Sequence, residues 1–312
     1  MLRTICLNPV IDRIYYVDHF AVGRQFKEVS PRIYNGGKGI NVARVIACLG
    51  EPCVLYTFAG GTTGQQIVEE MQSLGVKLRV FPLNGETRTT INIIDRASGL
   101  ETEITEPGAA IASEQEEDLL HVLSEEIASG DIVICSGIPL PGMSVDIYRR
   151  IAAICKEAGA RCVLDVNSVY LKAAFPAPYA MVKPNYDELL SLCDTDMPFS
   201  DENMIRLGKR VMEMGPQSLL ISAGAEGGIL LCKEQIERAR FPRQEGIKST
   251  IGSGDATVAG YCVGMVRGLS ARESLRLAMA CGICNAKFSR VGYVERDMVD
   301  RLLKQIEVTS LL

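Results

Sequence analysis

Histidine is scarce in this sequence, and that scarcity excludes several kinds of catalytic site. Only His19 and His121 occur among the 312 residues. The first falls in a turn between predicted strands and the second on an amphipathic helix, so neither is predicted to be catalytic. A Ser-His-Asp or Cys-His arrangement cannot be built without them. Any general base in this chain is therefore expected to be a carboxylate.

The chain also lacks a positive charge excess and a long apolar run. The net charge of −5 and the pI near 5.3 exclude a general attraction to nucleic acid or to an anionic membrane. No apolar run approaches the roughly 18 residues that a membrane helix needs. The start, Met1 to Pro9, is too short an apolar run for a secretion signal. We therefore expect a cytoplasmic protein whose eleven cysteines are reduced thiols in the core.

The order of predicted elements indicates a single α/β domain covering residues 1–312. Apolar strands alternate with amphipathic helices, as in a mostly parallel sheet with helices on both faces. The predicted strands are 2–7, 53–59, 131–136, 161–165, 181–183, 218–222 and 228–232. The predicted helices are 40–49, 65–74, 114–128, 145–157, 202–214, 255–265, 271–288 and 297–305.

Two inserts interrupt this alternation with strands that lack a following helix. One insert holds predicted strands at 14–17 and 27–34, and the other at 87–95 and 101–105. The β-branched and aromatic residues of the first strand favour an extended chain. We expect these strands to form a small sheet outside the main layer, a lid built from about residues 10–36 and 86–107.

The segment Ser249 to Gly260 carries the strongest chemical signal. Gly252, Ser253 and Gly254 predict a tight turn, and Asp255 follows in the first turn of an apolar helix. Free N–H groups at a helix start bind anions, but an adjacent carboxylate would repel one. Asp255 is therefore predicted to take a proton from a hydroxyl while the amides hold the charge on a phosphoryl group. An ordinary N-terminal helix acid after a glycine turn fits the same letters.

A second glycine turn, residues 36–41, places a cation and an amide at the start of a helix. Gly37 allows close approach of a ligand, and Lys38 can meet an anionic group. The chain contains no Walker motif, and this segment lacks the full dinucleotide-binding spacing. A structural turn before a helix is the alternative.

Other candidates are weaker taken singly. Asn185 and Glu188 are spaced to position water or Mg²⁺ near phosphates, although a capping box explains the same letters. The glycine-rich run Ser222 to Gly228 fits a nucleotide loop or a hairpin turn equally. Arg88 could grip a phosphate with two nitrogens, and Lys27 is a further cation. Either cation could instead be a solvated surface charge.

Taken together, four motifs resemble the ribokinase-like, PfkB-type sugar kinases. They are Asn8-Pro9-Val10-Ile11-Asp12, the run from Gly36 to Arg44, Lys183-Pro184-Asn185, and Gly252-Ser253-Gly254-Asp255. The resemblance covers nearly the whole chain, and two separate glycine motifs in the right order make it specific. It is nearest to the branch that contains 1-phosphofructokinases and tagatose-6-phosphate kinases. It implies a three-layer αβα core with a mostly parallel sheet and a small β-sheet lid.

The resemblance also implies ATP and Mg²⁺ as cofactors and assigns roles to individual residues. Asp255 matches the catalytic base, and Gly252, Ser253 and Gly254 match the anion hole. The sugar-phosphate positions are Asp12, Gly37, Lys38, Asn41, Arg88 and Lys27. The nucleotide positions are Lys183, Asn185, Ser222, Gly224, Gly227 and Asn285. Glu188 matches a residue linked to the metal through water.

These assignments predict a kinase that converts a ketohexose monophosphate to a 1,6-bisphosphate. We expect 1-phosphofructokinase activity, with tagatose-6-phosphate kinase as the alternative and a homodimer formed through the lid. One departure stands out, because Ile138 occupies a place where relatives commonly have serine. A silent sugar-phosphate sensor would be expected to lose the base or the anion hole, and both are present. A dinucleotide oxidoreductase would need glycines where Leu7-Asn8-Pro9 stands.

Overall fold

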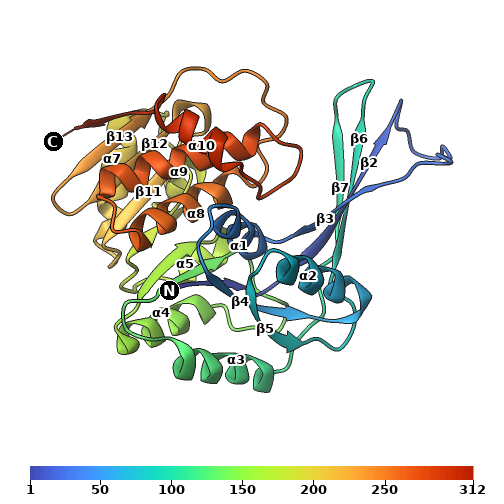
Figure 1. The fold of residues 1–312 in the computed structure, drawn as a ribbon, viewed down its shortest axis with the longest axis horizontal. Coiled ribbons are helices and arrows are strands. Elements are labelled where there is room, and N and C mark those ends of the chain that lie inside the picture. Colours follow the sequence, from blue (N-terminus) through green and yellow to red (C-terminus); the bar gives the residue numbers. More distant parts are fainter. Residues whose placement is uncertain (312) are drawn as a thin grey trace.

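A large, mostly parallel sheet forms the centre of the molecule (Figure 1). The structure, a computed structural model, describes residues 1–311. The strands of this sheet, in chain order, are β1 Leu2–Cys6, β4 Cys53–Ala59, β5 Lys77–Pro82, β8 Ile132–Ser136, β9 Arg161–Asp165, β10 Met181–Val182, β11 Ser218–Ser222, β12 Gly228–Cys232, β13 Ile236–Arg240 and β14 Glu307–Ser310. Their order across the sheet is β14-β13-β12-β11-β10-β9-β8-β1-β4-β5.

The neighbouring strands β11-β10-β9-β8-β1-β4-β5 run parallel to one another, and β12, β13 and β14 add an antiparallel edge. β1 pairs with β4 on one side and with β8 on the other, so the N-terminal strand is central. A parallel sheet gathers the carboxyl ends of its strands at one edge, where α/β proteins bind ligands. The predicted α/β class with a mostly parallel sheet is confirmed.

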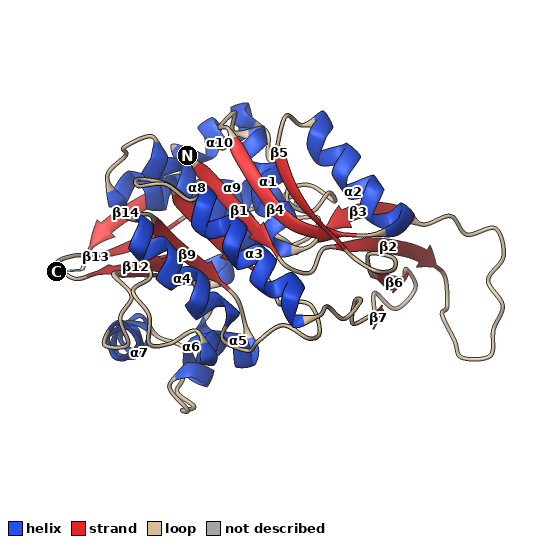
Figure 2. Ribbon diagram, turned by 90° about the horizontal axis from the view of Figure 1, so that it is seen from below, coloured by secondary structure: helices blue, strands red, loops and turns tan. Residues whose placement is uncertain are grey.

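Helices cover both faces of this sheet (Figure 2). Side chains alternate between the faces of a strand, and accordingly Leu2 and Cys6 of β1 join one apolar cluster and Ile5 joins the other. The first cluster packs under α1 Lys38–Cys48, α2 Gly61–Ser73, α8 Ser253–Val266, α9 Ala271–Ala286 and α10 Arg296–Leu303. The second packs under α3 Ser113–Glu126, α4 Ile147–Ala158, α5 Ser168–Ala173, α6 Tyr186–Leu192 and α7 Asp201–Met212.

A second, smaller sheet projects from the core (Figure 1). Its strands are β2 Val10–Val17, β3 Arg32–Gly36, β6 Thr89–Asp95 and β7 Glu101–Thr105, in the order β3-β2-β6-β7. The prediction of a strand over residues 27–34 was wrong in extent, because residues 18–31 form a loop and pairing with β2 begins only at Arg32. Both inserts therefore contribute to one sheet that stands apart from the main one.

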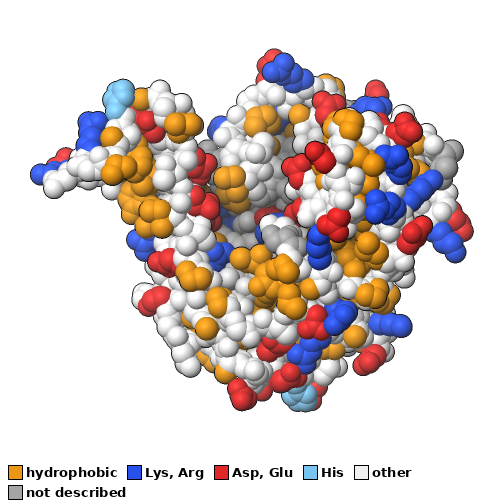
Figure 3. Space-filling view, turned by 180° about the vertical axis from the view of Figure 1, so that it is seen from behind, with side chains coloured by type: hydrophobic (Ala, Val, Ile, Leu, Met, Phe, Trp, Pro, Cys, Tyr) orange, Lys and Arg blue, Asp and Glu red, His pale blue; other side chains and the backbone are white. Residues whose placement is uncertain are grey.

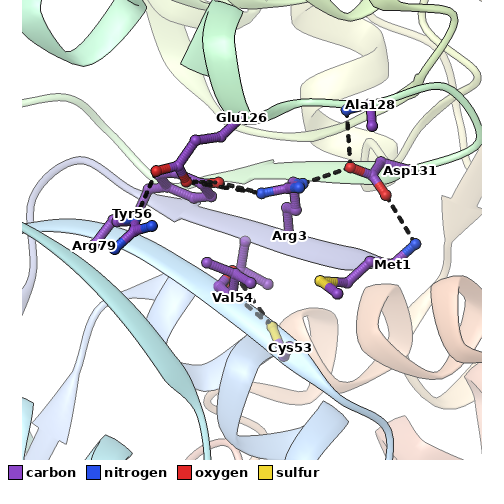
Figure 4. A network of polar contacts seen from close by, with 10 residues as sticks. Met1, Arg3, Cys53, Val54, Tyr56, Arg79, Glu126, Ala128 and Asp131 are labelled. Atoms are coloured by element: carbon purple, nitrogen blue, oxygen red, sulfur yellow. Dashed lines mark hydrogen bonds and ion pairs between the residues drawn. The ribbon is translucent and has the colours of Figure 1, made fainter. Parts of the chain in front are cut away.

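A polar network fixes β1 at the centre of the main sheet (Figure 4). Arg3 Nε donates to Asp131 Oδ2 over 2.6 Å, and its Nη1 donates to the Tyr56 hydroxyl. Glu126 accepts from Tyr56 at 2.8 Å and from Arg79 at 2.6 Å. Burial alone would raise the pKa of Asp131, but its hydrogen bonds, including that from Arg3, hold the pKa below the usual value. The network joins β1 to β4, β5 and the end of α3.

The structure adds two findings on composition. All eleven cysteines are free, and most are buried, in agreement with the prediction of reduced core thiols. Across residues 1–311, none of the helices combines the length and the apolar character needed to cross a membrane.

Candidate active site

The predicted catalytic segments meet at the edge of the main sheet where the parallel strands end. Figure 3 shows that the molecular surface is hollowed between the small sheet and the main body. The starts of α1 and α8 and the ends of β9 and β10 bring charged side chains together at this edge. A helix start presents unbonded N–H groups and a partial positive charge, so this arrangement suits an anionic ligand.

Asp255 lies in the first turn of α8, directly after a tight turn that requires glycine. Gly252 precedes the helix with φ +77°, a conformation that favours glycine, and a Cβ there would lie 2.5 Å from Val291 Cγ1. Asp255 is 4% exposed. Asn41 Nδ2, from α1, donates to Asp255 Oδ2 over 2.8 Å. The two glycine motifs, more than 200 residues apart in the chain, are thus joined by this hydrogen bond.

Two lysines and a second buried carboxylate surround this pair. Asp165, at the end of β9, is fully buried, and its Oδ1 lies 3.4 Å from Lys38 Nζ and 3.2 Å from Lys183 Nζ. Lys183 is 5% exposed, and a Cβ built on Gly254 would lie 3.4 Å from its Nζ. The ammonium of Lys183 therefore lies between Asp165 and the start of α8, where phosphate groups would be attracted.

The electrostatic balance of the site favours a base that works near neutral pH. Burial raises the pKa of Asp255 to about 6, with Asp165 adding to the rise, while Lys38, Lys183 and the Asn41 hydrogen bond oppose it. Burial would lower the pKa of Lys38, but Asp165, Asp255 and Glu188 together keep it above its usual value. Two cations and an ionisable base thus coexist in one desolvated site.

The first turn of α8 offers two free donors beside Asp255. Ser253 N–H donates to the Thr250 carbonyl at 3.1 Å, and Ala256 N–H to the Gly252 carbonyl at 2.9 Å. Within residues 1–311, the N–H groups of Gly254 and Asp255 have no such partner. They can stabilise charge that develops on a transferred group.

A second group of residues lies at the base of the small sheet. Asp12, on β2, approaches Gly36 so closely that a Cβ on Gly36 would lie 2.4 Å from Asp12 Oδ2. Burial raises the pKa of Asp12 to about 6 against the opposing charge of Arg88. Arg88 Nη1 donates to the Glu106 carbonyl at 3.3 Å, but its buried Nε has no hydrogen-bond partner among the described residues. An anion from a ligand would satisfy that nitrogen.

Gly37 shapes the junction between the small sheet and α1. It precedes α1 with φ +105°, and a Cβ there would lie 3.0 Å from Cys6 Sγ. Only glycine fits both the dihedral angle and the space. The turn places Lys38 and Asn41 in the first turn of α1, one facing Asp165 and the other Asp255.

The remaining predicted residues gather at the ends of β10 and β11. Asn185 begins α6 as a capping box, because its side chain accepts from Glu188 N–H and its own N–H donates to Glu188 Oε2, both at 2.8 Å. Asn185 also bridges to Ser222 at the end of β11. Gly224 lies in the tight turn that joins β11 to the antiparallel β12, and a Cβ there would meet nothing within 4 Å. The glycine-rich run is therefore a hairpin turn whose backbone is open at Gly224, whereas Gly227, with φ +88°, is packed against the Ala239 carbonyl.

Comparison with known proteins places the chain. A sequence model described as pfkB family carbohydrate kinase matches residues 5–293. The chain belongs to this family of carbohydrate kinases. A 1-phosphofructokinase of Bacillus subtilis is 32% identical over 312 residues, and a tagatose-6-phosphate kinase of Staphylococcus epidermidis is 30% identical over 313, each alignment spanning 100% of both proteins. The crystal structure of phosphofructokinase-2 from Escherichia coli with potassium superposes with a TM-score of 0.89 at 24% identity, covering 97% of this chain and 98% of that one.

Two of the predicted site residues of this pfkB kinase are not available in the candidate active site. One lies on a distant loop, and the side chain of the other is hydrogen-bonded to the backbone of the fold. Lys27 is exposed on the loop between β2 and β3, which extends away from the core (Figure 1). Asn285, on α9, is 1% exposed. Its Nδ2 donates to the Ile251 carbonyl at 2.8 Å and its Oδ1 accepts from Tyr293 N–H at 3.2 Å. Asn285 therefore holds the turn before α8.

Sequence reasoning did not single out Asp165, Asn8 or Arg44 for the site. Asp165 was predicted only as the last residue of a strand, although a carboxylate at the end of a parallel strand is a usable signal. Its Oδ2, like Asn8 Oδ1 and Ser136 Oγ, is buried and has no hydrogen-bond partner among the side chains and backbone groups that the structure describes. Unsatisfied buried polar atoms are rare in proteins and point to a ligand or water. Ile138, next to this group, is 39% exposed.

Proposed function

We propose that the protein transfers the γ-phosphoryl group of ATP to a ketohexose monophosphate and that fructose 1-phosphate is the preferred acceptor. The product would be fructose 1,6-bisphosphate. The observation that carries the proposal is the buried carboxylate of Asp255, held by Asn41 beside two free N–H groups and near two lysines. This combination meets the two needs of phosphoryl transfer, which are a proton acceptor and stabilisation of charge.

The chemical step follows from these groups. The free hydroxyl oxygen of the sugar attacks the γ-phosphorus, the bond from that phosphorus to the ADP oxygen breaks, and the hydroxyl proton passes to Asp255. The N–H groups of Gly254 and Asp255 and the ammonium of Lys183 stabilise the charge on the migrating group. A pKa of about 6 leaves Asp255 ionised at neutral pH and still able to hold a proton in the transition state. Closure of the small sheet over the sugar, as a lid, would exclude water.

Magnesium fits this site as a partner of the ATP phosphates. No three His, Cys, Asp or Glu side chains of residues 1–311 form a ready metal cage. Mg²⁺ in kinases is usually held by phosphates and waters with few carboxylates. Glu188 uses Oε2 for the capping box, so we assign its other oxygen to a metal-bound water. The metal would neutralise charge on the phosphates.

The choice of sugar rests on the relatives and on Arg88. The Bacillus subtilis relative is named a 1-phosphofructokinase and the Staphylococcus epidermidis relatives tagatose-6-phosphate kinases, so tagatose 6-phosphate is the second candidate. We assign the existing phosphate of the sugar to Arg88, whose Nε lacks a partner, and the sugar hydroxyls to Asp12, Lys38 and Asn41. Ile138 cannot supply a hydroxyl contact, so Asp12 carries more of the sugar recognition.

An acceptor panel tests this assignment. In an assay of ATP consumption, kcat/KM is expected to be highest with fructose 1-phosphate and lower with tagatose 6-phosphate, fructose 6-phosphate and free fructose. Arg88→Gln should lower kcat/KM for the phosphorylated sugars by about 10²-fold, the loss expected for a charge-assisted contact to phosphate, and leave free fructose unchanged. The control is Arg96→Gln, because Arg96 is an exposed arginine in the turn between β6 and β7. Equal losses for free and phosphorylated fructose would contradict the role of Arg88.

We also propose that the small sheet forms a homodimer contact. Its outer face has a shallow depression of about 340 Å³ lined by Tyr15, Val17, Phe20, Phe26, Val29, Ile91, Ile93 and Ile104. Ile104 is 56% exposed, and apolar patches of this kind mark association surfaces. Ile104→Lys should convert the dimer to a monomer in light scattering. Leu100→Lys, 70% exposed and outside that face, should leave the mass unchanged. A monomeric parent protein would contradict this contact.

A further inference from the structure

A buried arginine lies behind the Asn41–Asp255 hydrogen bond. Arg44, on α1, is 2% exposed, and its Nη1 donates to Asn41 Oδ1 at 2.9 Å and to the Val291 carbonyl at 3.1 Å. Residues three apart on a helix share a face, which is why Arg44 reaches Asn41. Arg44 therefore contacts the amide that donates to Asp255, without contacting Asp255 itself.

The contact from Arg44 decides which way the Asn41 amide points. An asparagine amide has an acceptor oxygen and a donor nitrogen at nearly the same positions, so it can turn over. With Oδ1 accepting from Arg44, Nδ2 must face Asp255. The opposite orientation would set an amide oxygen against a carboxylate and a guanidinium against an NH₂ group, and both contacts are repulsive.

The other side of Arg44 is bound to the small sheet and to α2. Its Nη2 donates to the Asn35 carbonyl of β3 at 2.5 Å, and its Nε donates to Glu70 Oε1 at 3.0 Å. Asn35 Nδ2 in turn donates to Glu70 Oε2 at 2.6 Å. Arg290 completes the cluster from the exposed side, 2.8 Å from Glu70 Oε1. Asn35 comes directly before the Gly36-Gly37 turn, so the cluster joins the base of the small sheet to the catalytic amide.

We propose that Arg44, held by Glu70, is a positioning residue that orients the Asn41 amide toward Asp255 and couples this orientation to strand β3. The proposal rests on the proposed function, because it assumes that Asp255 is the base. It predicts that any change of β3 at Asn35 is transmitted to the base through one guanidinium. A fork of several fixed donors is needed for this, and lysine cannot replace it.

The proposal has a directional consequence for the pH profile. The groups that face Asp255 are Lys38 and Asn41 from α1, Asp165 at the end of β9 and Lys183 directly after β10. The Asn41 hydrogen bond lowers the pKa of Asp255, so losing it raises the pKa. A base must be deprotonated to act, and the acidic limb of kcat/KM would therefore move to higher pH. The expected movement is about one pH unit, as for loss of one hydrogen bond to a charged group.

The decisive experiment compares pH profiles of three variants with the parent enzyme. Arg44→Lys keeps the charge but cannot contact Asn41, Val291 and Asn35 together, and its acidic limb should move up by about one pH unit. Glu70→Gln removes the charge that holds Arg44 and should move the limb in the same direction by less. Arg290→Gln, on the exposed side of Glu70, should leave the limb in place.

Three results distinguish the outcomes. A variant of Arg44 or Glu70 with a lower melting temperature but an unmoved acidic limb overturns the proposal and makes the cluster structural. If Arg44→Lys does not fold, Glu70→Gln decides on the same readout. If Asp255→Asn keeps near-normal turnover, the proposed function itself fails, and that result is separate from any movement of the limb in the Arg44 and Glu70 variants.

Discussion

Asp255→Asn is expected to lower kcat by about 10²-fold to 10⁴-fold, the usual contribution of a general base. The substitution keeps the shape of the side chain, and its amide oxygen can still accept from Asn41 Nδ2. The two N–H groups at the start of α8 are backbone atoms and are unchanged. Nucleotide affinity measured by calorimetry should therefore stay close to that of the parent protein, while turnover is lost.

The same variant should not lose stability at neutral pH. The folded-state pKa of Asp255 is raised to about 6, above its usual value of 3.8. A carboxyl group with a raised pKa stabilises the folded state most when the pH is below the pKa of the unfolded state. This stabilisation is lost as the pH rises through about 6, the pKa in the folded state. At pH 8 the ionised, buried carboxylate is a cost that asparagine removes. The melting temperature of Asp255→Asn at pH 8 is expected to equal or exceed that of the parent.

A matched control exists on α10. Asp297 is also an acid in the first turn of a helix, but it is exposed and outside the site. Asp297→Asn should keep full kcat. Near-normal turnover in Asp255→Asn, or an equal loss in both variants, would remove Asp255 from the chemistry.

Local signals allowed much of this site to be predicted from the sequence. Gly37 and Gly252 both adopt positive φ at helix starts, and a glycine before an apolar helix is visible in the letters. Asn185 and Glu188 form the capping box that their spacing indicates. In each case the interaction is complete within a few residues, so no knowledge of the tertiary fold is needed.

The missed features depend on partners that are distant in the sequence. Arg44 meets Glu70 and Val291, which lie on other elements, and a single arginine in an apolar helix gives no sign of them. Strand β13 was missed because three of its five residues are charged, although Arg238 is 1% exposed and bonded to Asp201 at 2.9 Å. Strand β14, Glu307–Ser310, was missed because it is only four residues long and follows a helix at the end of the described chain. The strand predicted from residue 27 extends only from Arg32, because register follows pairing with β2.

Asp165→Asn is the second variant expected to have a large effect, here on stability. Asp165 lies between Lys38 and Lys183 and is fully buried. Removing one partner of a buried ion pair leaves an uncompensated charge and typically costs about 3–5 kcal/mol. Because Lys38 is one-third exposed and partly solvated, the loss should come mainly from Lys183. Urea unfolding at pH 7 without nucleotide measures it.

Two further measurements separate this effect from ordinary destabilisation. Burial opposes the charge on Asp165, but the two lysines hold the pKa of Asp165 below its usual value. The ionised carboxylate therefore stabilises the folded protein at any pH above the pKa of the unfolded state. This stabilisation is lost as the pH falls through the pKa of the folded state. The gap between parent and variant should therefore narrow in acid. ATP phosphates would replace the missing negative charge beside Lys183, and the rise in melting temperature with ATP should exceed that of the parent.

Asp201→Asn provides the comparison for the nucleotide effect. Asp201 also pairs with a buried arginine, Arg238, but it does so at the antiparallel edge of the sheet. That variant should lose stability and show the same ATP-induced rise as the parent protein. An Asp165→Asn variant as stable as the parent would mean that the two lysines do not depend on Asp165. An ATP-induced rise in melting temperature equal to that of Asp201→Asn would mean that phosphates do not bind between the two lysines. A larger ATP response confined to Asp165→Asn would tie the buried carboxylate to the nucleotide side of the site.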